Sequence, residues 1–376
     1  MKTSHRICHI TIGHNPLDDR IFYKEVCSLA LKYKDIYIVA LERQKIKEKN
    51  GVKFSLFKEG NFFSNLIHAF KTAKKIKADL YHIHEFELLP FALVLKYKYH
   101  KKVIYDAHET IYFYFTEFSR HSKFITFLPA IFAQSLEWFC SHFVDHIITV
   151  TPWVAKGFKP FHKRISLIYN YPILNLFLPI PQKTKKKREK IILYHGQLVP
   201  ARNIDVMLKA MSFVKKDFPN VKLLIVGGIT DWYKIQLEQI IKQNHLEDVV
   251  EFRKPIPYKN IPGLIKEATI GLSSMAPNES FKRSIQIKPF EFMTMGVPVL
   301  GCRVPSTEIF IEQTESGILI DPPTAENLGK TINYLLKNPS VMEQMGKNGR
   351  KAVSEKYNWS FMENKLYDIY EEVLKC

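Results

Sequence analysis

The stretch Ile-Ile-Leu-Tyr-His-Gly-Gln-Leu-Val-Pro-Ala-Arg-Asn-Ile-Asp-Val, residues 191–206, decides the fold class. A short apolar run, Ile191–Tyr194, leads into a loop that contains Gly196, and a helix can begin at Ile204. Strand, glycine-containing loop and helix in this order form the repeating unit of parallel α/β sheets. Ligands of such sheets bind beyond the carboxyl ends of the strands, where loops present backbone amides and helix N-termini.

The same unit recurs on both sides of this stretch, because short runs of β-branched and aromatic residues alternate with helical segments. The predicted strands are Ile7–Ile12, Ile36–Leu41, Leu80–His84, Lys102–Asp106, His146–Val150, Ser166–Tyr169, Ile191–Tyr194, Lys222–Val226, Val249–Phe252, Thr269–Ser273, Val297–Gly301 and Ile318–Asp321. The pattern predicts an α/β fold with two Rossmann-like, doubly wound parallel-sheet domains. We place them at residues 1–175 and 191–357, joined by a basic linker at 176–190.

Two helices are predicted from local signals. Arg20 to Tyr33 carries apolar residues among charges, including Leu31, and suits an amphipathic crossover helix. Near the end of the chain, Ser360 and Glu363 form a capping box, with a hydroxyl at the cap and a carboxylate three residues later. This box predicts a final helix within residues 358–376.

Length and composition agree with a globular two-domain protein. The 376 residues are 46% hydrophobic and 24% charged, which supports two cores and excludes a fibrous or largely disordered chain. We find no apolar run long enough to span a bilayer, and the N-terminus lacks the apolar core of a signal peptide. The five cysteines are far apart, without metal-ligand or CxxC spacing. These features predict a soluble, cytoplasmic protein.

The net charge of +18 is unevenly distributed along the chain. Residues 1–180 carry +11, residues 181–190 carry +5, and residues 191–376 carry only +2. A basic first half indicates an anionic partner, such as nucleic acid, a phosphorylated substrate or an acidic membrane surface.

The first half offers several candidate residues at predicted strand ends. Gly13 lies in the loop after the first strand, where a glycine lets the backbone approach a ligand, and Asp19 and Arg20 follow at the start of the helix. His108 and Glu109 follow the strand that ends at Asp106. A neutral histidine there can donate a hydrogen bond to a sugar or phosphate, although a packing role remains open.

A metal site is not expected in this half. His82 and His84 share one face of a strand, but no third ligand follows at metal spacing. We therefore predict no metal and no other cofactor.

The second half carries stronger signals. Gly196 permits close backbone approach, and Arg202 lies near a helix start, where its fixed charge suits a diphosphate. Lys288 and Glu291 are three residues apart, so they are neighbours on one helix face. The carboxylate can accept two hydrogen bonds from ribose hydroxyls while the lysine meets phosphate. An isolated Lys-x-x-Glu pair is more often a surface ion pair.

The segment Lys288-x-x-Glu291-Phe-Met-x-x-Gly296-x-Pro298-Val299 resembles the donor-site motif of the retaining family-4 glycosyltransferases. Further segments along most of the chain are similar to family segments. These are Tyr194-His-Gly196 with Arg202-Asn-Ile-Asp205, Leu224-Ile-Val-Gly227-Gly228, Gly317-Ile-Leu-Ile-Asp321-Pro-Pro323, Asp106-x-His108-Glu109, Val144–Val150 and Leu167–Pro172.

The resemblance implies the GT-B architecture, in which two Rossmann-like domains face each other across a cleft. The N-terminal domain of such enzymes binds the acceptor, the C-terminal domain binds a nucleotide-sugar, and a final helix returns to the N-terminal domain. Members generally need no metal, since positive side chains and helix N-termini stabilise the leaving diphosphate.

The resemblance also assigns roles to residues of this chain. We assign catalysis to His108, Arg202 and Lys288. We assign donor binding to Gly13, Gly196, Gln197, Arg202, Gly228, Lys288 and Glu291. We assign the acceptor side to Asp19, Arg20 and Glu109.

Two positions depart from the family pattern. Many members carry a glutamate eight residues before the second motif glutamate, and Arg283 stands at that position here. Gln197 stands where many members have an arginine, while Arg202 takes the place of the usual lysine. One of two phosphate cations is therefore retained, and Lys288 is a candidate for the other.

These features predict a retaining glycosyltransferase that moves a sugar from a nucleoside-diphosphate sugar, with UDP or GDP, to a hydroxyl acceptor. Another GT-B enzyme, such as a sugar-nucleotide epimerase or a phosphorylase, is the main alternative. A nucleic-acid-binding protein is disfavoured, because no nucleic-acid-binding motif accompanies the basic linker.

Two segments of the first half suggest where the acceptor lies. Phe62–Lys77 is basic and amphipathic, and Ile111–Cys140 is rich in aromatic residues. Such segments can lie on an anionic bilayer, or they can be core-facing helices with a solvated lysine face. The membrane alternative predicts a peripheral enzyme on the inner face of the cell membrane, acting on a lipid-linked saccharide in surface polysaccharide or glycoconjugate biosynthesis.

Overall fold

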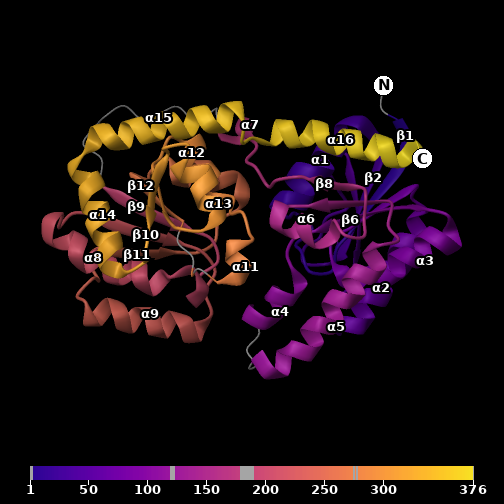
Figure 1. Cartoon of the computed structure of the whole chain (residues 1–376), viewed down its shortest axis with the longest axis horizontal. Coiled ribbons are helices and arrows are strands. Elements are labelled where there is room, and N and C mark those ends of the chain that lie inside the picture. Colours follow the sequence, from indigo (N-terminus) through magenta and orange to yellow (C-terminus); the bar gives the residue numbers. More distant parts are fainter. Residues whose placement is uncertain (1–2, 119–122, 178–189, 274–275, 277, 376) are drawn as a thin grey trace. The chain divides into compact units, whose positions relative to one another are not determined.

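The computed structural model of the chain describes residues 3–118, 123–177, 190–273, 276 and 278–375. The chain forms two compact units, one of residues 1–170 with 359–376 and the other of residues 171–358 (Figure 1). Each unit is a parallel-sheet α/β structure, so the predicted fold class is confirmed. Most of the predicted basic linker, residues 178–189, lies outside the described residues.

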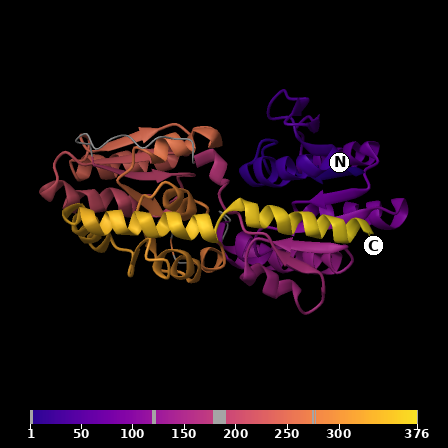
Figure 2. The same cartoon turned by 90° about the horizontal axis from the view of Figure 1, so that it is seen from above.

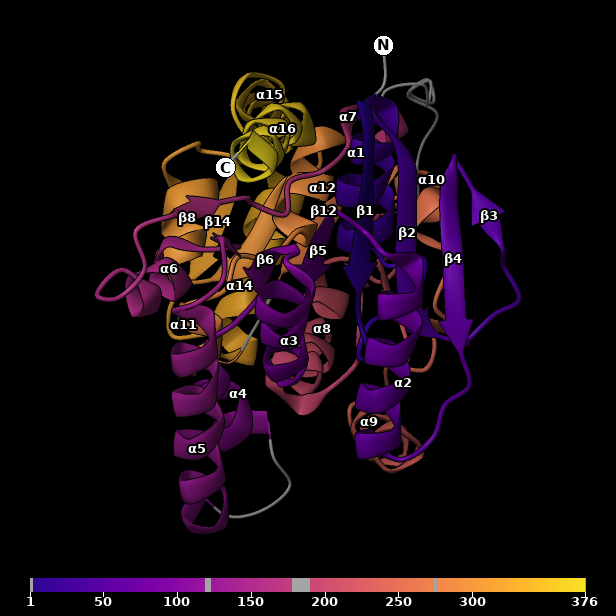
Figure 3. The ribbon, with the colours of Figure 1, turned by 90° about the vertical axis from the view of Figure 1, so that its right-hand side faces the viewer.

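The first unit is built on an eight-stranded sheet in the order β3-β4-β2-β1-β5-β6-β7-β8. Its strands are β1 (Thr3–Ile10), β2 (Tyr33–Leu41), β3 (Glu48–Lys49), β4 (Val52–Phe57), β5 (Leu80–Ile83), β6 (Lys102–Ala107), β7 (His146–Thr149) and β8 (Ile165–Leu167). All neighbours are parallel except β3 and β4, which pair antiparallel at the outer edge (Figure 3). The strands β3 and β4 were not among the predicted strands.

Helices cover both faces of this sheet. They are α1 (Cys27–Lys32), α2 (Phe62–Ile76), α3 (Leu89–Tyr99), α4 (Ile111–Phe118), α5 (Lys123–Ser141), α6 (Pro152–Phe158) and α16 (Trp359–Lys375), with a π-helix at Asp19–Val26 and a 3₁₀ turn at Phe86–Leu88. An apolar core packs α2, α3 and α5 against one face. On the other face, Trp359 of α16 donates from its indole to the Ser28 hydroxyl at 2.8 Å. Figure 2 shows α16 in yellow along this unit.

The second unit contains a six-stranded, fully parallel sheet in the order β11-β10-β9-β12-β13-β14. Its strands are β9 (Ile191–His195), β10 (Lys222–Val226), β11 (Val250–Arg253), β12 (Ile270–Ser273), β13 (Val299–Cys302) and β14 (Gly317–Ile320). Its helices are α7 (Leu174–Phe177), α8 (Ile204–Asp217), α9 (Asp231–Gln243), α10 (Ile261–Ile265), α11 (Glu279–Lys282), α12 (Lys288–Thr294), α13 (Pro305–Thr307), α14 (Ala325–Lys337) and α15 (Pro339–Glu355), with short turns at Pro200–Arg202, Tyr258–Asn260 and Glu308–Glu312. The core packs α8, α9 and α14 against one face of the sheet.

Two of the local helix predictions need correction. The crossover segment begins as the π-helix and ends at Lys32, and Leu31 is exposed instead of lying on the buried face. The final helix begins at Trp359, so Ser360 lies inside it and is not its cap. Within the described residues, we find no helix that combines the length and the apolar character needed to cross a membrane.

Candidate active site

The loop after β9 has a shape that only glycine can adopt. Gly196 has a φ of +126°, and a Cβ atom on it would lie 2.6 Å from Cε and 2.9 Å from Nζ of Lys288. Any side chain at this position would therefore displace the lysine. The loop and the lysine, which are 92 positions apart in the sequence, form one wall of the site.

A second glycine fixes this loop against the neighbouring strand end. The Gly196 amide donates to the Val226 carbonyl at 2.9 Å, and the Leu198 amide donates to the Gly228 carbonyl at 2.9 Å. A Cβ on Gly227 would lie 1.8 Å from the Gly196 carbonyl oxygen, so no side chain fits there. Gly228 has ordinary space around it, with Pro255 at 3.6 Å. Gly227 is thus the position at which the fold requires glycine, and Gly228 is exposed beside it.

Two cations lie near the glycine loop. Lys288, the first residue of α12, is buried, donates to the Tyr194 hydroxyl at 3.2 Å, and places Nζ 4.5 Å from the centre of that ring. Arg202 ends the Pro200–Arg202 turn, with its guanidinium 4.6 Å from the centre of the Phe281 ring. Burial lowers the pKa of Lys288 well below its usual value, and the charge of Arg202 lowers it further. Two such cations in one region are suited to an anion.

Glu291, the residue predicted to bind the ribose, is more deeply buried than we expected. Glu291 lies on α12 with only 2% of its surface exposed, and its Oε2 is 3.4 Å from His195 Nε2. Burial and the charge of Lys288 lower the pKa of His195 to about 3, so this histidine is neutral beside the carboxylate. His195 was not among the predicted site residues, although it directly precedes Gly196.

The structure shows the surroundings of Arg283 and Gln197, the two residues that depart from the family motif. Arg283, at the position of the absent glutamate, pairs with Glu279 on the same turn of chain. Gln197 is exposed on the loop beside Gly196.

In the first unit, the loop after β1 is occupied by a carboxylate of the protein itself. The amide of Gly13 donates to Glu85 Oε1 at 3.0 Å, and the Ile12 amide donates to Oε2 at 3.2 Å. The Thr11 hydroxyl also donates to Glu85. Because Glu85 accepts from the Gly13 amide here, a donor would have to displace this carboxylate, and donor binding by Gly13 stays a prediction.

Arg20 is buried and paired, contrary to our expectation of a cation open to an anion. Its Nη2 lies 3.0 Å from Asp106 Oδ2, and its Nη1 donates to the Ile168 carbonyl at 2.9 Å. Only 3% of the residue is exposed. Arg20 and His108 outweigh burial and hold the pKa of Asp106 well below its usual value. The ion pair is structural, so Arg20 cannot meet an acceptor directly.

Of the remaining candidates of this unit, His108 and Glu109 follow β6, and Asp19 lies elsewhere. His108 is partly exposed, with Nε2 3.3 Å from Asp106 Oδ2, and its ring centre is 5.2 Å from that of His14. Glu109 is half-buried, and burial raises the pKa of its carboxyl. Asp19 lies at the start of the π-helix, 3.7 Å from Lys24 Nζ.

His14 is a further residue that the sequence did not single out. Burial opposes its protonation, but hydrogen bonding to Asp18 and the charges of Asp18 and Glu85 raise its pKa to about 9. Its Nδ1 lies 3.4 Å from Asp18 Oδ2. The result is a cationic imidazole beside His108 at neutral pH.

Two family models match the chain in sequence. The model of Glycosyl transferases group 1 matches residues 179–352, and the model of Glycosyltransferase Family 4 matches residues 33–171. Together they cover most of the chain. The chain belongs to the family-4 glycosyltransferases.

This glycosyltransferase is also similar to characterised proteins. It is 23% identical to human alpha-1,3/1,6-mannosyltransferase ALG2 over 66% of this chain and 64% of the relative. The curated relatives are matched over about two thirds of their own length. Sucrose-phosphate synthase from Thermosynechococcus elongatus has a similar fold (TM-score 0.78, 18% identity, 99% of both chains). So does Anabaena HepE, solved in complex with UDP-glucose (TM-score 0.75, 15% identity, 98% of this chain and 100% of HepE).

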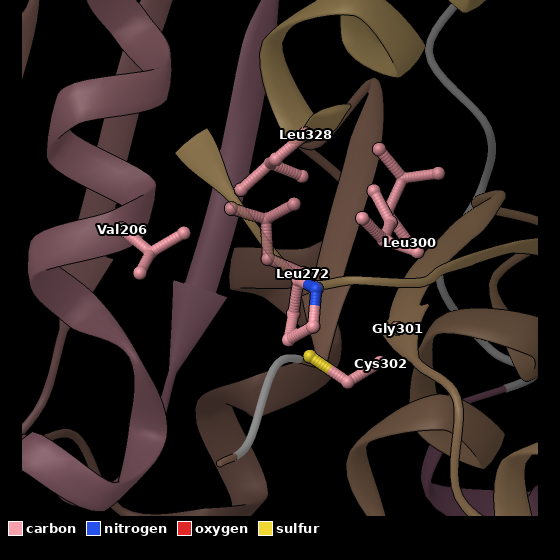
Figure 4. Close-up of a pocket in the computed structure, with 8 residues that line it drawn as sticks. Val206, Leu272, Leu300, Gly301, Cys302 and Leu328 are labelled. Atoms are coloured by element: carbon pink, nitrogen blue, oxygen red, sulfur yellow. The ribbon is translucent and has the colours of Figure 1, made fainter. Parts of the chain in front are cut away.

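A small pocket in the second unit of the glycosyltransferase does not suit a nucleotide-sugar. Figure 4 shows Val206, Leu272, Leu300 and Cys302 around it, at the ends of β12 and β13. Its lining is apolar and offers no charged group for a phosphate. The cations near Gly196 are therefore the better candidate site.

Proposed function

We propose that this glycosyltransferase moves a sugar from a nucleoside-diphosphate sugar to a hydroxyl acceptor, with retention of anomeric configuration. The observation that carries the proposal is the convergence of Lys288 and Arg202 beside Gly196. Buried like charges destabilise each other unless an anion binds between them. A diphosphate supplies that anion and can approach the loop closely because Gly196 has no side chain.

The chemistry follows from charge development in the transition state. Breaking the bond between the sugar and the diphosphate leaves negative charge on the departing oxygen, and fixed cations stabilise it. Arg202 and Lys288 take this role, without a metal at the donor site. Glu291 binds the ribose, after its carboxylate turns away from His195. Without that turn, Glu291 only positions His195.

Retention requires the acceptor hydroxyl to attack from the face that the diphosphate leaves. A departing diphosphate oxygen then accepts the proton of the hydroxyl, and no carboxylate nucleophile is required. His108, the partly exposed histidine at the end of β6, donates a hydrogen bond to the transferred sugar or its phosphate.

The nucleotide is proposed to be UDP or GDP. HepE was solved in complex with UDP and with UDP-glucose, which supports a uridine nucleotide for a protein of this fold. The relative ALG2 is a mannosyltransferase.

The acceptor is proposed to be a lipid-linked saccharide at an anionic membrane on the cytoplasmic side. Helix α5 presents large apolar side chains to solvent, and α2, which packs on the same sheet face, presents both apolar and cationic ones. On α5 these residues are Ile125, Phe127, Leu128, Ile131, Phe132, Trp138 and Phe139; on α2 they are Phe62, Phe63, Ile67, Lys71, Lys74 and Lys75. Such a surface combines apolar insertion with attraction to anionic lipid.

A panel of nucleoside diphosphates and their sugars, read by thermal shift, tests the donor. The correct donor at 100 times its Kd stabilises the protein by about 2.7 kcal/mol. Arg202→Ala should cost about 2 to 4 kcal/mol of the activation barrier. Lys209→Ala, which removes an exposed lysine of α8, is the matched control and should leave the rate unchanged.

Two results would contradict the proposal. One is that no nucleotide or nucleotide-sugar raises the melting temperature. The other is wild-type transfer by both Arg202→Ala and Glu291→Ala. Release of the nucleoside diphosphate without any added acceptor would favour the alternative function, a sugar-nucleotide epimerase, over a transferase.

A further inference from the structure

The first unit contains a buried group of imidazoles that the proposed transfer does not use. His9 on β1 and His82 on β5 are register partners in the sheet, so they lie on the same face. His84 follows two residues after His82 and shares that face. The π-helix adds Glu25 above them. Each of these four residues offers one ligand atom, and the four atoms lie within 4.8 Å of one another.

The polar atoms of this group are incompletely satisfied. Among the described residues, neither carboxylate oxygen of Glu25 nor Nε2 of His82 has a hydrogen-bond partner, and both side chains are fully buried. Glu25 Oε1 forms an ion pair with Arg20 Nε at 3.0 Å, while the hydrogen bonds of that guanidinium go to Asp106 and to the Ile168 carbonyl. A buried carboxylate oxygen such as Glu25 Oε2 and a buried imidazole nitrogen such as His82 Nε2, both without a hydrogen bond, are costly unless something binds between them.

The other ring nitrogens are already held by a second set of groups. Nδ1 of His82 lies 2.6 Å from the Tyr370 hydroxyl, and Nε2 of His9 lies 3.0 Å from the same oxygen. Nδ1 of His84 faces Asp106 Oδ2 at 3.7 Å. Metal-bound histidines commonly donate their second nitrogen to such partners, which fix the ring and its tautomer. Nδ1 of His9, Nε2 of His82 and Nε2 of His84 then remain to face inward.

Two of the inward nitrogens already lie close together. His9 Nδ1 and His84 Nε2 are at hydrogen-bond distance, 2.9 Å, so they would have to separate slightly to reach the roughly 3.3 Å between two nitrogens of a tetrahedral zinc site. Without a metal, a single proton must lie between these two nitrogens.

We propose that His9, His82, His84 and Glu25 bind a divalent metal ion of the zinc class as a structural centre of the first unit. Three imidazoles and one carboxylate are a donor set that zinc favours. The neighbouring group of His84, Asp106 and His108 is less suited, because both oxygens of Asp106 accept from Arg20. The sequence alone predicts no zinc at His82 and His84, because no third ligand follows them at metal spacing. The third and fourth ligands, His9 and Glu25, come from other elements of the fold.

The test uses the full chain, purified without a histidine tag. We expect one zinc per chain by elemental mass spectrometry. After chelator treatment, added Zn²⁺ at about 100 times its Kd should raise the melting temperature by about 5 to 10 °C. Added Co²⁺ should give the visible absorption of a tetrahedral site.

Variants separate this site from the alternatives. Glu25→Gln keeps the size of the side chain, and it should weaken Zn²⁺ binding by about 100-fold. His146→Gln is the matched control, since His146 is a buried histidine on β7 of the same sheet, bonded to Ser166, and should bind Zn²⁺ like the wild type. Substoichiometric zinc, together with no Zn²⁺ or Co²⁺ response of the stripped wild-type protein, would overturn the proposal and leave a hydrogen-bonded histidine cluster.

Discussion

Gly196 and Gly228 lie at the ends of adjacent strands, but their backbones differ. Gly196 has a positive φ and faces Lys288, whereas Gly228 has neither constraint. We expect Gly196→Ala to destabilise the protein by about 1 to 3 kcal/mol and to weaken donor binding, because the backbone is strained and the lysine is displaced. Gly228→Ala should stay within about 0.5 kcal/mol. Urea denaturation compares the two variants, and equal losses would contradict this account of Gly196.

His14 gives the first unit a specific dependence on pH. Its pKa is raised to about 9 from 6.5, so its contribution to stability is complete below about pH 6.5 and disappears as the pH rises through 9. His14→Gln should therefore be less stable than wild type at pH 6, and the difference should be small at pH 10. Denaturation curves at several pH values measure it. A constant difference would show that the ion pair with Asp18 does not form.

At the level of single residues, the sequence predicts the donor side better than the loop of the first unit. Gly196, Arg202 and Lys288 were identified from their motif and do lie near one another. The contacts of Gly13 with Glu85 and of Arg20 with Asp106 were not foreseen, because these partners are far away in sequence. Spacing along the chain carries no information about those pairs.

Helix α5 yields a prediction at the level of one element. Leu128→Asp with Phe132→Asp removes two of its most exposed apolar side chains and adds charges that repel anionic lipid. The variant should lose at least about tenfold in binding to phosphatidylglycerol vesicles at low salt, and keep its donor-induced thermal shift. Ile235→Asp, on α9 and also exposed (56%, against 72% for Leu128 and 70% for Phe132), is the control and should bind like wild type. Unchanged binding of the double variant would contradict the membrane proposal.

Elements with strong periodicity were predictable, and irregular ones were not. The ends of the central strands were located to within four residues from their apolar runs. Strand β4 was omitted, although the alternation of Val52, Phe54 and Leu56 is a readable strand signal. The π-helix was not predictable, because π-helices are rare and the residue pattern of this segment does not distinguish one from an α-helix.

For the whole molecule, the assignment of each helix to one of the two units predicts which sheet a core mutation destabilises. Leu366 of α16 is fully buried in the first unit, and Leu335 of α14 is fully buried in the second. Leu366→Ala should cost about 2 to 5 kcal/mol and speed amide exchange in β1 and β2. Leu335→Ala should have the reciprocal effect on β9 and β10. Exchange measured by mass spectrometry tests this, and spread of either effect equally over both sheets would contradict it.

The number of sheets and their parallel character followed from the alternation of elements, but strand order did not. The order places β1 between β2 and β5, and β9 between β10 and β12. It is set by how crossover helices pack on each face, a three-dimensional property that no local run of residues encodes. For the same reason, the meeting of His9, His84 and Glu25 could not be read from the sequence.

The first unit is discontinuous, since residues 359–376 complete it after the whole of the second has been added. During synthesis on the ribosome, the face of the sheet that holds His9 and His82 lacks the contacts of α16, including the Tyr370 hydroxyl beside both histidines, until α16 emerges from the exit tunnel. The later-translated sheet, being contiguous, can reach its native state first. Nascent chains of this protein are therefore most exposed to chaperones at their oldest end.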